Sequence, residues 1–599
     1  MRRYVVGVVL AVVVVCAFGA VAVGETTAHP HHDAETVDVD RSGASTADTG
    51  QVLGVGSDDE IELTTTLDRT PEQVGEITAT SSVRIPDRVT ELTLRIPEEA
   101  TVVETEGFSE NADGNYAWDE RTDDPSVTFR VSADRRVDSD GPLAEEGELL
   151  FTETDEWALI ATPSVGTSWR YSGGGEMTVD RRTEIDGPGV VGERMAFLGE
   201  YDEHTHTAHN QRFRLIVPHA AELDESPETI FDSLGHASDR LRVGERDEEV
   251  FMVAAPTAGV DWAVSGLQGG SSDLWVGDDE RVDTPTNVWV HEYVHARQNY
   301  ETTDETEWFT EASATYYAAL LTLEEGRISV EEFQRYLADG ENDPQSGAVL
   351  SDPASWENNA DYRKGALVSG EIDRQIRVTT EGESSFDDVF RSLNSHDGEL
   401  AAADFEGYVA AAANSEVASK ARGYTTTADT PEMWDSSEHE AAFGQSPARF
   451  TFSLADDDPL TVTDSDGSTA VSRENLTISV GQTVTVNMTV TNIGGTVGNY
   501  ELPFAVANES TTETGRLAPE ETATHEFTHT FDETGSYTIA AGDDRVDVTV
   551  EAEPEPTDVP ADIDSTDVPI DVEVPGFGLS AALAAILFGL LVLGRRSRN

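Results

Sequence analysis

The sequence predicts a multidomain α+β protein, in which two β-sandwiches flank a central α/β region that continues into helices, with an apolar helix at the end. Three observations support this class. Short runs of alternating apolar and polar residues, separated by turn residues, occur from about 60 to 170 and again from about 448 to 550. Between them, strand-like runs give way to helical apolar periods. Residues 579–593 form an apolar stretch that is followed by arginines.

Residues 1–24 have the features of a secretory signal peptide. Two arginines stand at the start, the run Tyr4–Phe18 is apolar, and Ala20–Ala22 offers small residues for cleavage. The alternative is an uncleaved membrane anchor. Cys16 is the only cysteine and falls inside this segment, so a mature chain would hold no disulfide.

The next segments are a spacer and a β domain. Residues 25–58 are rich in Thr, Asp, Ser, Gly and His without an apolar period, which predicts a disordered acidic spacer. Residues 59–170 contain short alternating stretches, which predict an N-terminal β-sandwich. Examples are Ser82–Ile85, Leu92–Ile96 and Val127–Val131.

Residues 171–435 are expected to carry the chemistry. Arg212–Val217 and Val250–Ala254 read as strands with a helix, Pro227–Val243, between them. Further helices are expected downstream, for example at Phe386–Leu393 and Phe405–Ala413.

The most informative feature of this region is the motif His291-Glu292-Tyr293-Val294-His295. Residues four apart share one face of a helix, so the two histidines can direct imidazoles at one metal ion. Glu292 is placed to polarise a water, and Glu311, sixteen positions after His295, would be a third ligand. This leaves one position open, as catalytic zinc (Zn²⁺) requires.

The alternative for this motif is an exposed helix with two solvated histidines. The apolar residues around the motif favour a half-buried helix instead. Glu311 lies near the start of a second apolar helix, within Glu311–Thr322. A buried acid is costly unless a partner neutralises it, and a metal ion would do so.

These residues resemble the gluzincin metallopeptidases, in which two histidines and a downstream glutamate hold zinc. The short gap to Glu311, within Trp308-Phe309-Thr310-Glu311, is similar to the compact peptidase MA-like branch related to the M1 and M61 enzymes. The resemblance implies a zincin-type catalytic domain. Asp361-Tyr362-Arg363-Lys364-Gly365 is similar to the YxKG segment of the M1-like enzymes, which implies that Tyr362 stabilises the oxyanion. Thr315 is a weaker candidate for orienting a ligand.

The chain departs from the M1 aminopeptidases in one stretch. Those enzymes carry a G-x-M-E-N segment whose glutamate binds the free amino group of the substrate. The corresponding stretch here, Gly266–Val276, has no such glutamate. The sequence therefore favours an endopeptidase over an aminopeptidase.

A second histidine cluster comprises His204, His206 and His209. Its spacing fits a strand end or loop better than one helix face, and no acid stands in register to act as a base. We expect it to be structural or solvated.

Residues 448–551 return to a strand pattern, as in Leu476–Val480, and resemble an Ig-like, CARDB-type domain. Three N-glycosylation sequons, at Asn475, Asn487 and Asn508, fall here. A Pro- and acid-rich linker is expected over 552–573.

The last segment, 574–599, begins with Pro575, Gly576 and Phe577 and resembles the PGF-CTERM sorting signal of haloarchaeal surface proteins. The resemblance implies that an archaeosortase-like enzyme removes the helix and a lipid anchor replaces it. The alternative is an ordinary transmembrane anchor. In both cases the body of the protein would lie outside the cell, at the membrane or S-layer.

The formal net charge is −78, from 116 acidic and 38 basic residues. The acids are spread along the chain, as in secreted proteins of extreme halophiles, so we expect the fold to need high salt. The same charge argues against nucleic acid as a partner.

Together these features predict a cell-surface zinc metallopeptidase that hydrolyses peptide or protein substrates in high salt. The catalytic residues would be Glu292 and Tyr362, and the zinc ligands His291, His295 and Glu311. The alternative is an S-layer-associated structural or adhesion protein with a non-catalytic peptidase-like fold.

Overall fold

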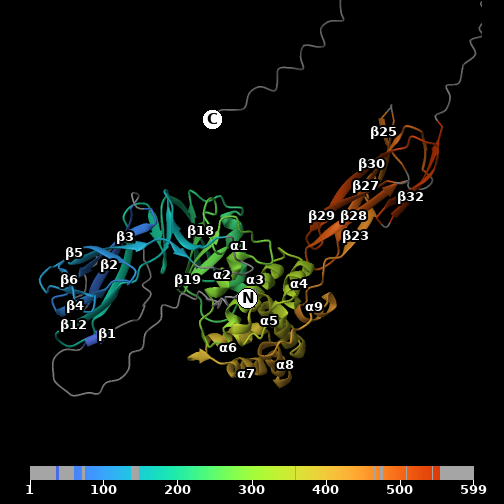
Figure 1. Cartoon of the computed structure of the whole chain (residues 1–599). Helices are drawn as coiled ribbons and strands as arrows, with labels where there is room; N and C mark the ends of the chain where they lie inside the picture. Colours follow the sequence, from blue (N-terminus) through green and yellow to red (C-terminus); the bar gives the residue numbers. More distant parts are fainter. Residues whose placement is uncertain are drawn as a thin grey trace, which may run out of the picture.

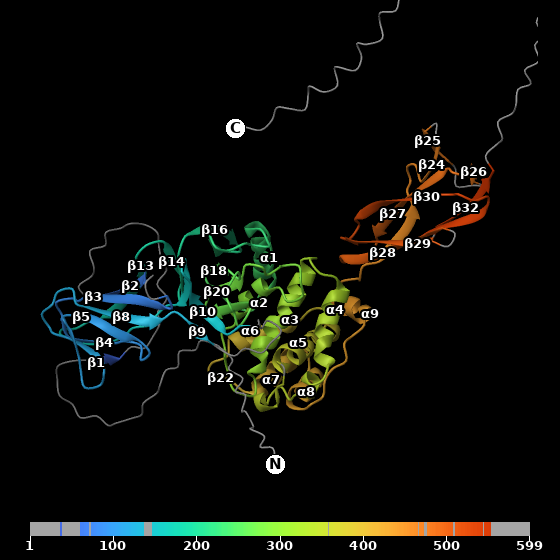
Figure 2. The same cartoon turned by 45° about the horizontal axis from the view of Figure 1, so that its top comes forward.

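The computed structural model describes residues 36–38, 60–70, 74–136, 147–357, 359–464, 467–471, 476–506, 509–542 and 544–552. Over these ranges the chain forms a β-rich part, then a mixed body with many helices, and then a second β-rich part that projects from the body (Figure 1). A second view shows the same order (Figure 2). The prediction of a multidomain protein of mixed α and β structure is confirmed.

Several predicted segments lie outside the described residues. They are the signal peptide 1–24, nearly all of the spacer 25–58, the sequons at Asn475 and Asn508, residues 553–573 of the linker, and the tail 574–599 with Pro575, Gly576 and Phe577. Within the described part of the chain, no helix is both long enough and apolar enough to cross a membrane.

The N-terminal part is a sandwich of two five-stranded sheets around one apolar core. Alternate residues of each long strand are buried, as in Ile61, Leu63 and Leu67, which follows from the two-residue period of a strand. The first sheet has the order β13 (Thr178–Ile185), β2 (Glu60–Arg69), β3 (Glu76–Arg84), β8 (Ser126–Ser132) and β5 (Thr101–Glu106). The second has the order β1 (Thr36–Asp38), β12 (Gly166–Tyr171), β4 (Val89–Arg95), β7 (Tyr116–Trp118) and β6 (Phe108–Glu110).

This sandwich extends past the boundary that the sequence suggested. Residue 170 lies inside β12, and the following strand, β13, pairs in parallel with β2 along its whole length. The sandwich therefore needs residues up to Ile185 to complete its first sheet.

A third sheet, absent from the sequence prediction, lies between the sandwich and the central body. Its order is β14 (Gly189–Val191), β15 (Met195–Leu198), β11 (Ala158–Ala161), β10 (Leu149–Glu153) and β9 (Arg135–Arg136). Phe197 of β15 and Trp157, the residue before β11, share a core with Trp262 and Trp275 of the central body. The Trp262 and Trp275 rings lie 4.7 Å apart. This shared core joins the two parts.

The central body contains a five-stranded mixed sheet. Its order is β16 (Tyr201–Ala208), β17 (Gln211–Pro218), β18 (Glu249–Ala255), β20 (Asp273–Gly277) and β19 (Gly266–Gly269). The strands β17, β18 and β20 are parallel, and the antiparallel strands β16 and β19 form the two edges. The helix α1 (Pro227–Arg240) connects β17 to β18. The two strands and the helix predicted here are confirmed.

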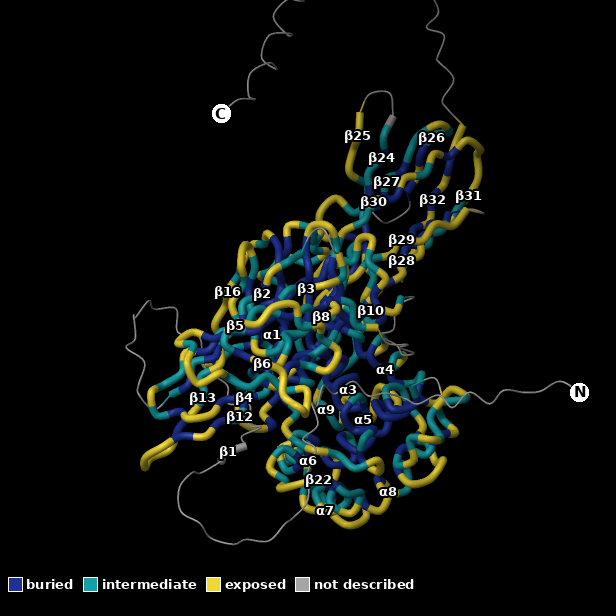
Figure 3. Tube along the Cα trace, turned by 60° about the vertical axis from the view of Figure 1, so that its left-hand side comes forward, coloured by how far each residue is buried: buried dark blue, intermediate teal, exposed yellow. Residues whose placement is uncertain are grey.

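Helices make up the rest of the body. The helix α2 (Val288–His295) packs against α3 (Trp308–Glu324), and α3 packs against α5 (Ala360–Thr379). A Cβ at Gly365 would lie 2.6 Å from the Cβ of Ala312, so this glycine allows α5 to approach α3 closely. Both helices lie in the buried centre of the body (Figure 3). The others are α4 (Val330–Ala338), α6 (Phe386–Asn394), α7 (Ala402–Ala412), α8 (Ser415–Thr426) and α9 (Ser436–Phe443).

The C-terminal part is a second two-sheet sandwich with its own core. One sheet comprises β23 (Phe450–Leu454), β27 (Thr483–Asn492), β24 (Leu460–Asp464), β25 (Gly467–Ala470) and β30 (Thr522–Thr530). The other has the order β26 (Leu476–Ser479), β32 (Asp544–Glu551), β31 (Gly535–Ala541), β28 (Gly498–Val506) and β29 (Glu509–Leu517). The predicted sandwich is confirmed, and its CARDB-type assignment stays a prediction.

One ion pair ties this sandwich to the helical body. The guanidinium of Arg516, on β29, bonds both carboxylate oxygens of Glu332 at 2.9 and 3.0 Å, and the carbonyl of Arg327 at 2.7 Å. Glu332 also caps the start of α4 through Ser329. Arg516 and Ser329 therefore hold the same carboxylate.

Candidate metal centre

The helix α2 is fixed at its start by a buried asparagine. Asn287 is the N-cap and accepts a bond from the amide of Val290. Its Nδ2 donates to the carbonyl of Val282 and to Thr322 of α3. These bonds satisfy groups at the helix start and set the position of α2 relative to α3. The ligand candidates on the two helices are thereby held together.

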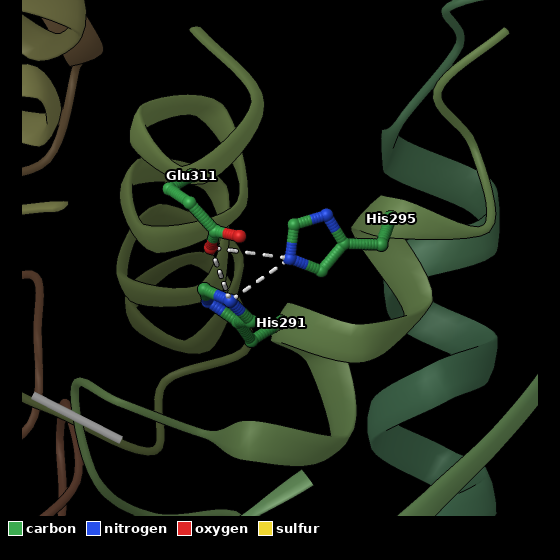
Figure 4. Close-up of side chains that lie close together, drawn as sticks. All are labelled: His291, His295 and Glu311. Atoms are coloured by element: carbon green, nitrogen blue, oxygen red, sulfur yellow. Dashed lines mark hydrogen bonds and ion pairs between the residues drawn. The ribbon is translucent and has the colours of Figure 1, made fainter. Parts of the chain in front are cut away.

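The structure brings the three predicted metal ligands to one point (Figure 4). The Nε2 atoms of His291 and His295 lie 3.1 Å apart, and each is 3.4 Å from Oε2 of Glu311. One ligand atom from each residue lies within 4.8 Å of the other two. The helical spacing aligns the histidines, and the start of α3 supplies the carboxylate.

Burial and mutual attraction shift the pKa values of all three side chains in this cluster. Burial lowers the pKa of His291. Burial also opposes protonation of His295, but the Glu311 carboxylate outweighs it and raises the pKa of His295 to about 9. Burial alone would raise the pKa of Glu311, whereas His295 and His291 hold it well below its ordinary value. The carboxylate therefore depends on a cation beside it.

Two observations show that His291, His295 and Glu311 fit a zinc ion: the chemical type of their ligand atoms, and a buried oxygen of Glu311 that has no hydrogen-bond donor among the described residues. Two imidazole nitrogens and one carboxylate oxygen are zinc ligands, and three protein ligands leave a fourth position open. The Oε2 atom of Glu311 is buried and makes no hydrogen bond within the described part of the chain. A buried charged oxygen without a donor is unfavourable unless a cation binds it.

Glu292 lies in the same buried region but is not one of the three converging residues. Burial raises the pKa of its carboxyl group to about 8. The edge strand β19 lies directly against it: a Cβ on Gly266 would be 2.9 Å from Oε1 of Glu292. Glycine at this position therefore makes room for the carboxylate.

Tyr362 reaches the same site from α5. Its ring is parallel to the His291 ring, with centroids 6.0 Å apart and an interplanar angle of 4°. Burial, with the nearby charge of Glu311, raises the pKa of its hydroxyl well above the ordinary value. The hydroxyl therefore stays protonated and can donate a hydrogen bond.

Lys364 follows Tyr362 on the same helix, but its side chain bonds to the backbone of the segment before α5. Its side chain is buried, and Nζ donates to the carbonyls of Ser346 and Ala348 at 3.2 and 2.7 Å. Burial lowers the pKa of this ammonium to about 8. Lys364 thus anchors the segment before α5.

The other residues singled out from the sequence are not among the three converging residues. Thr315 is buried on α3, and its hydroxyl has no hydrogen-bond partner among the described residues. His204 and His206 lie on β16, with His206 stacked on Phe231, and His209 in the following turn pairs with Asp239 at 3.5 Å. Among the described residues, the group that could hold a metal ion comprises His291, His295 and Glu311 and none of these three histidines. Asn487 is on β27, and its amide donates to the carbonyl of Asp458.

Sequence reasoning missed Gln298. Its Oε1 lies 3.1 Å from Nδ1 of His295, and its Nε2 donates to the carbonyl of Thr310 at 2.8 Å and to Ser313 at 3.0 Å. An amide three positions after a candidate ligand is a weak signal, because its partners on α3 become apparent only in the fold.

Comparisons with known proteins give solved structures that resemble this chain at low similarity. No family model matches the chain, and no curated protein matches it. An M1 zinc metallopeptidase from Deinococcus radiodurans aligns over 63% of this chain and 95% of its own, with 14% identity and a TM-score of 0.40. An aminopeptidase N family protein from Idiomarina loihiensis aligns over 81% and 96%, with 12% identity and a TM-score of 0.41. At these scores the likeness carries no conclusion about activity, so any assignment of function rests on the candidate metal-ligating residues themselves.

Proposed function

We propose that this protein is a zinc-dependent metallopeptidase. The observation that carries the proposal is the convergence of His291, His295 and Glu311 within 4.8 Å, with the Glu311 oxygen buried, facing both imidazoles at 3.4 Å and without a hydrogen bond among the described residues. A buried acid next to the cluster, Glu292, distinguishes it from a purely structural zinc site, which needs no base.

Each residue has a defined task in peptide hydrolysis. Bound by the three ligands, Zn²⁺ would polarise the scissile carbonyl and lower the pKa of the attacking water and of Glu292. Glu292 takes a proton from that water as it attacks, and then gives it to the departing amine. Tyr362 donates its hydroxyl hydrogen to the oxygen on which negative charge develops.

We further propose internal cleavage rather than removal of amino-terminal residues. The edge strand β19 reads Gly-Leu-Gln-Gly and carries no acid for a substrate ammonium group. The next acid, Asp273, is buried and accepts hydrogen bonds from the amides of Arg194 and Met195. An extended peptide could still pair with the free edge of β19 through its main chain.

The proposed setting is the cell surface in concentrated salt. This part of the proposal is supported by the sequence: the signal-like N-terminus, the PGF-containing C-terminus and the net charge of −78. Its partners would be protein or peptide substrates, an archaeosortase-like processing enzyme, and a membrane or lipid anchor.

The test combines zinc content with cleavage of an unfolded protein in molar KCl. We expect about one zinc per chain in the wild type and in Glu292→Gln, with cleavage lower by at least about 10²-fold in the variant. The exposed Glu301 provides the control Glu301→Gln, which should cleave like wild type.

Zinc uptake by a wild type that cleaves nothing would favour the structural or adhesion alternative. Equal cleavage by wild type and Glu292→Gln would refute the assigned base. Peptides with acetylated amino termini test the mode of cleavage: an endopeptidase cuts them, and a strict aminopeptidase does not.

A further inference from the structure

Gln298 contacts both helices that supply the candidate ligands. It follows α2 by three positions, and its amide lies between His295 and the first turn of α3. On α3 it contacts Thr310, the residue before Glu311, and Ser313, two residues after it. One side chain therefore bridges the second ligand and the backbone that carries the third.

The contacts on α3 determine which way the amide points. The carbonyl of Thr310 can only accept a hydrogen bond, so the group of Gln298 that faces it at 2.8 Å must be the NH₂ group. Ser313 takes the second hydrogen at 3.0 Å, and its own hydroxyl is directed at the Thr310 carbonyl. The amide oxygen is left facing His295.

This contact fixes the orientation of the His295 ring, with Nδ1 toward Gln298 and Nε2 toward the other two candidate ligands. An amide oxygen accepts only, so Nδ1 of His295 must carry the hydrogen that joins them at 3.1 Å. A neutral imidazole protonated at Nδ1 has its lone pair at Nε2. Nε2 is the atom that faces Nε2 of His291 and the Glu311 carboxylate.

We propose that Gln298 is a positioning residue for the metal centre: it holds His295 in the ligating tautomer and locks that ligand to the start of α3. The inference rests on the proposed function, because it requires that the three residues bind zinc. An amide in this role orients the imidazole without adding a negative charge, unlike a carboxylate partner. Glu311 then remains the one anionic ligand.

The test is the zinc dissociation constant, measured by competition with a chromogenic chelator in molar KCl. Gln298→Leu keeps much of the side-chain volume and removes all three hydrogen bonds. We expect it to raise the zinc Kd by about 10- to 100-fold. Ser313→Ala removes one of the two contacts that orient the amide and leaves the bond to His295, so it should raise the Kd by a smaller factor.

The matched control is Gln334→Leu. Gln334 is also half-buried in the helical body and bridges the Trp434 carbonyl and Ser436. Unfolding of the metal-free proteins is measured in parallel, since a merely structural role would lower the stability of Gln298→Leu without changing its zinc Kd. Ser313→Ala keeps the inference testable if Gln298→Leu does not fold.

The outcomes separate this inference from the proposed function. A zinc Kd for Gln298→Leu or Ser313→Ala equal to that of Gln334→Leu would overturn the positioning role alone. A wild type that takes up no zinc would overturn both. A rise in Kd for both variants, larger for Gln298→Leu, with the control unchanged, is the result that supports the inference.

Discussion

The ring of Tyr362 lies parallel to the ring of His291, with centroids 6.0 Å apart. The two residues come from helices α5 and α2, 71 positions apart in the sequence. The stacking places a protonated phenol beside the first candidate metal ligand. Ring and hydroxyl therefore have separable roles: the ring stacks on the imidazole, and the hydroxyl, which stays protonated beside Glu311, can donate a hydrogen bond.

Replacing Tyr362 by phenylalanine tests this separation. The ring remains, so we expect the zinc Kd to stay unchanged. Loss of one donor to the developing oxyanion should lower kcat/KM by about 10²- to 10³-fold. Steady-state kinetics and zinc competition on the same preparation check both parts, and a weakened zinc affinity would mean that the hydroxyl helps to build the metal centre.

Gly266→Ala should impair catalysis without removing the metal. The added Cβ would lie 2.6 Å from Val288 and 2.9 Å from Oε1 of Glu292, so β19 or the carboxylate must shift. We expect lower kcat/KM with full zinc content. Gly269→Ala, on the same strand, would meet only the flexible end of Met195 at 2.8 Å and should have much less effect.

Asp273 should make stability depend on pH. Burial raises the pKa of this carboxyl group from 3.8 to about 6. Its contribution to stability is full below about pH 4, where it is protonated in both states, and is lost as the pH rises through about 6. The loss is on the order of 3 kcal/mol, because each pKa unit corresponds to about 1.4 kcal/mol.

Asp273→Asn provides the comparison, since its amide oxygen can still accept from Arg194 and Met195. Denaturant unfolding in molar KCl gives the difference in unfolding free energy between wild type and variant. We expect that difference to fall between about pH 4 and about pH 7, because other titrating groups contribute equally to both proteins. A difference that does not change with pH would contradict the assignment.

Arg516→Met should loosen the C-terminal sandwich from the helical body. The substitution removes the bidentate bond to Glu332 and the bond to the Arg327 carbonyl. Small-angle scattering should then show a broader distribution of maximum dimensions, with the unfolding of each part little changed. The exposed Arg545, on the same sandwich, supplies the control Arg545→Met.

The fold should require salt. With a net charge of −78, self-repulsion favours expanded states, and counter-ions at molar concentration screen it to within about 3 Å. We expect the thermal midpoint to rise steeply between about 0.1 and 3 M KCl. An unfolding curve that is the same at both concentrations would refute this expectation.

The parts of the fold and site that could be predicted are those governed by local spacing. The i, i+4 relation of His291 and His295 follows from helix geometry alone. The alternating strands of both sandwiches could be identified because one face of each strand is buried and carries apolar residues, whereas the other face is only half-buried and carries mostly polar ones. Glu311 could be found because an acid at the start of an apolar helix needs a partner.

The remaining features depend on packing between distant segments. The strands β10 and β15 are buried on both faces, with burial at every position, so they give no alternation to recognise. Tyr362 meets His291 only because Gly365 lets α5 approach Ala312 of α3. Gln298 has a role only through Thr310 and Ser313, which the fold brings to it.

The scarcity of lysine has a practical consequence. The only lysines are Lys364 and Lys420, and Lys364 is enclosed with its ammonium bonded to two carbonyls. Lys420 is exposed on α8. Amine-reactive reagents applied to the folded protein should therefore label one side chain in addition to the amino terminus. The side chain that takes up a dye or surface linker would be Lys420, on a helix that carries none of the three candidate ligands.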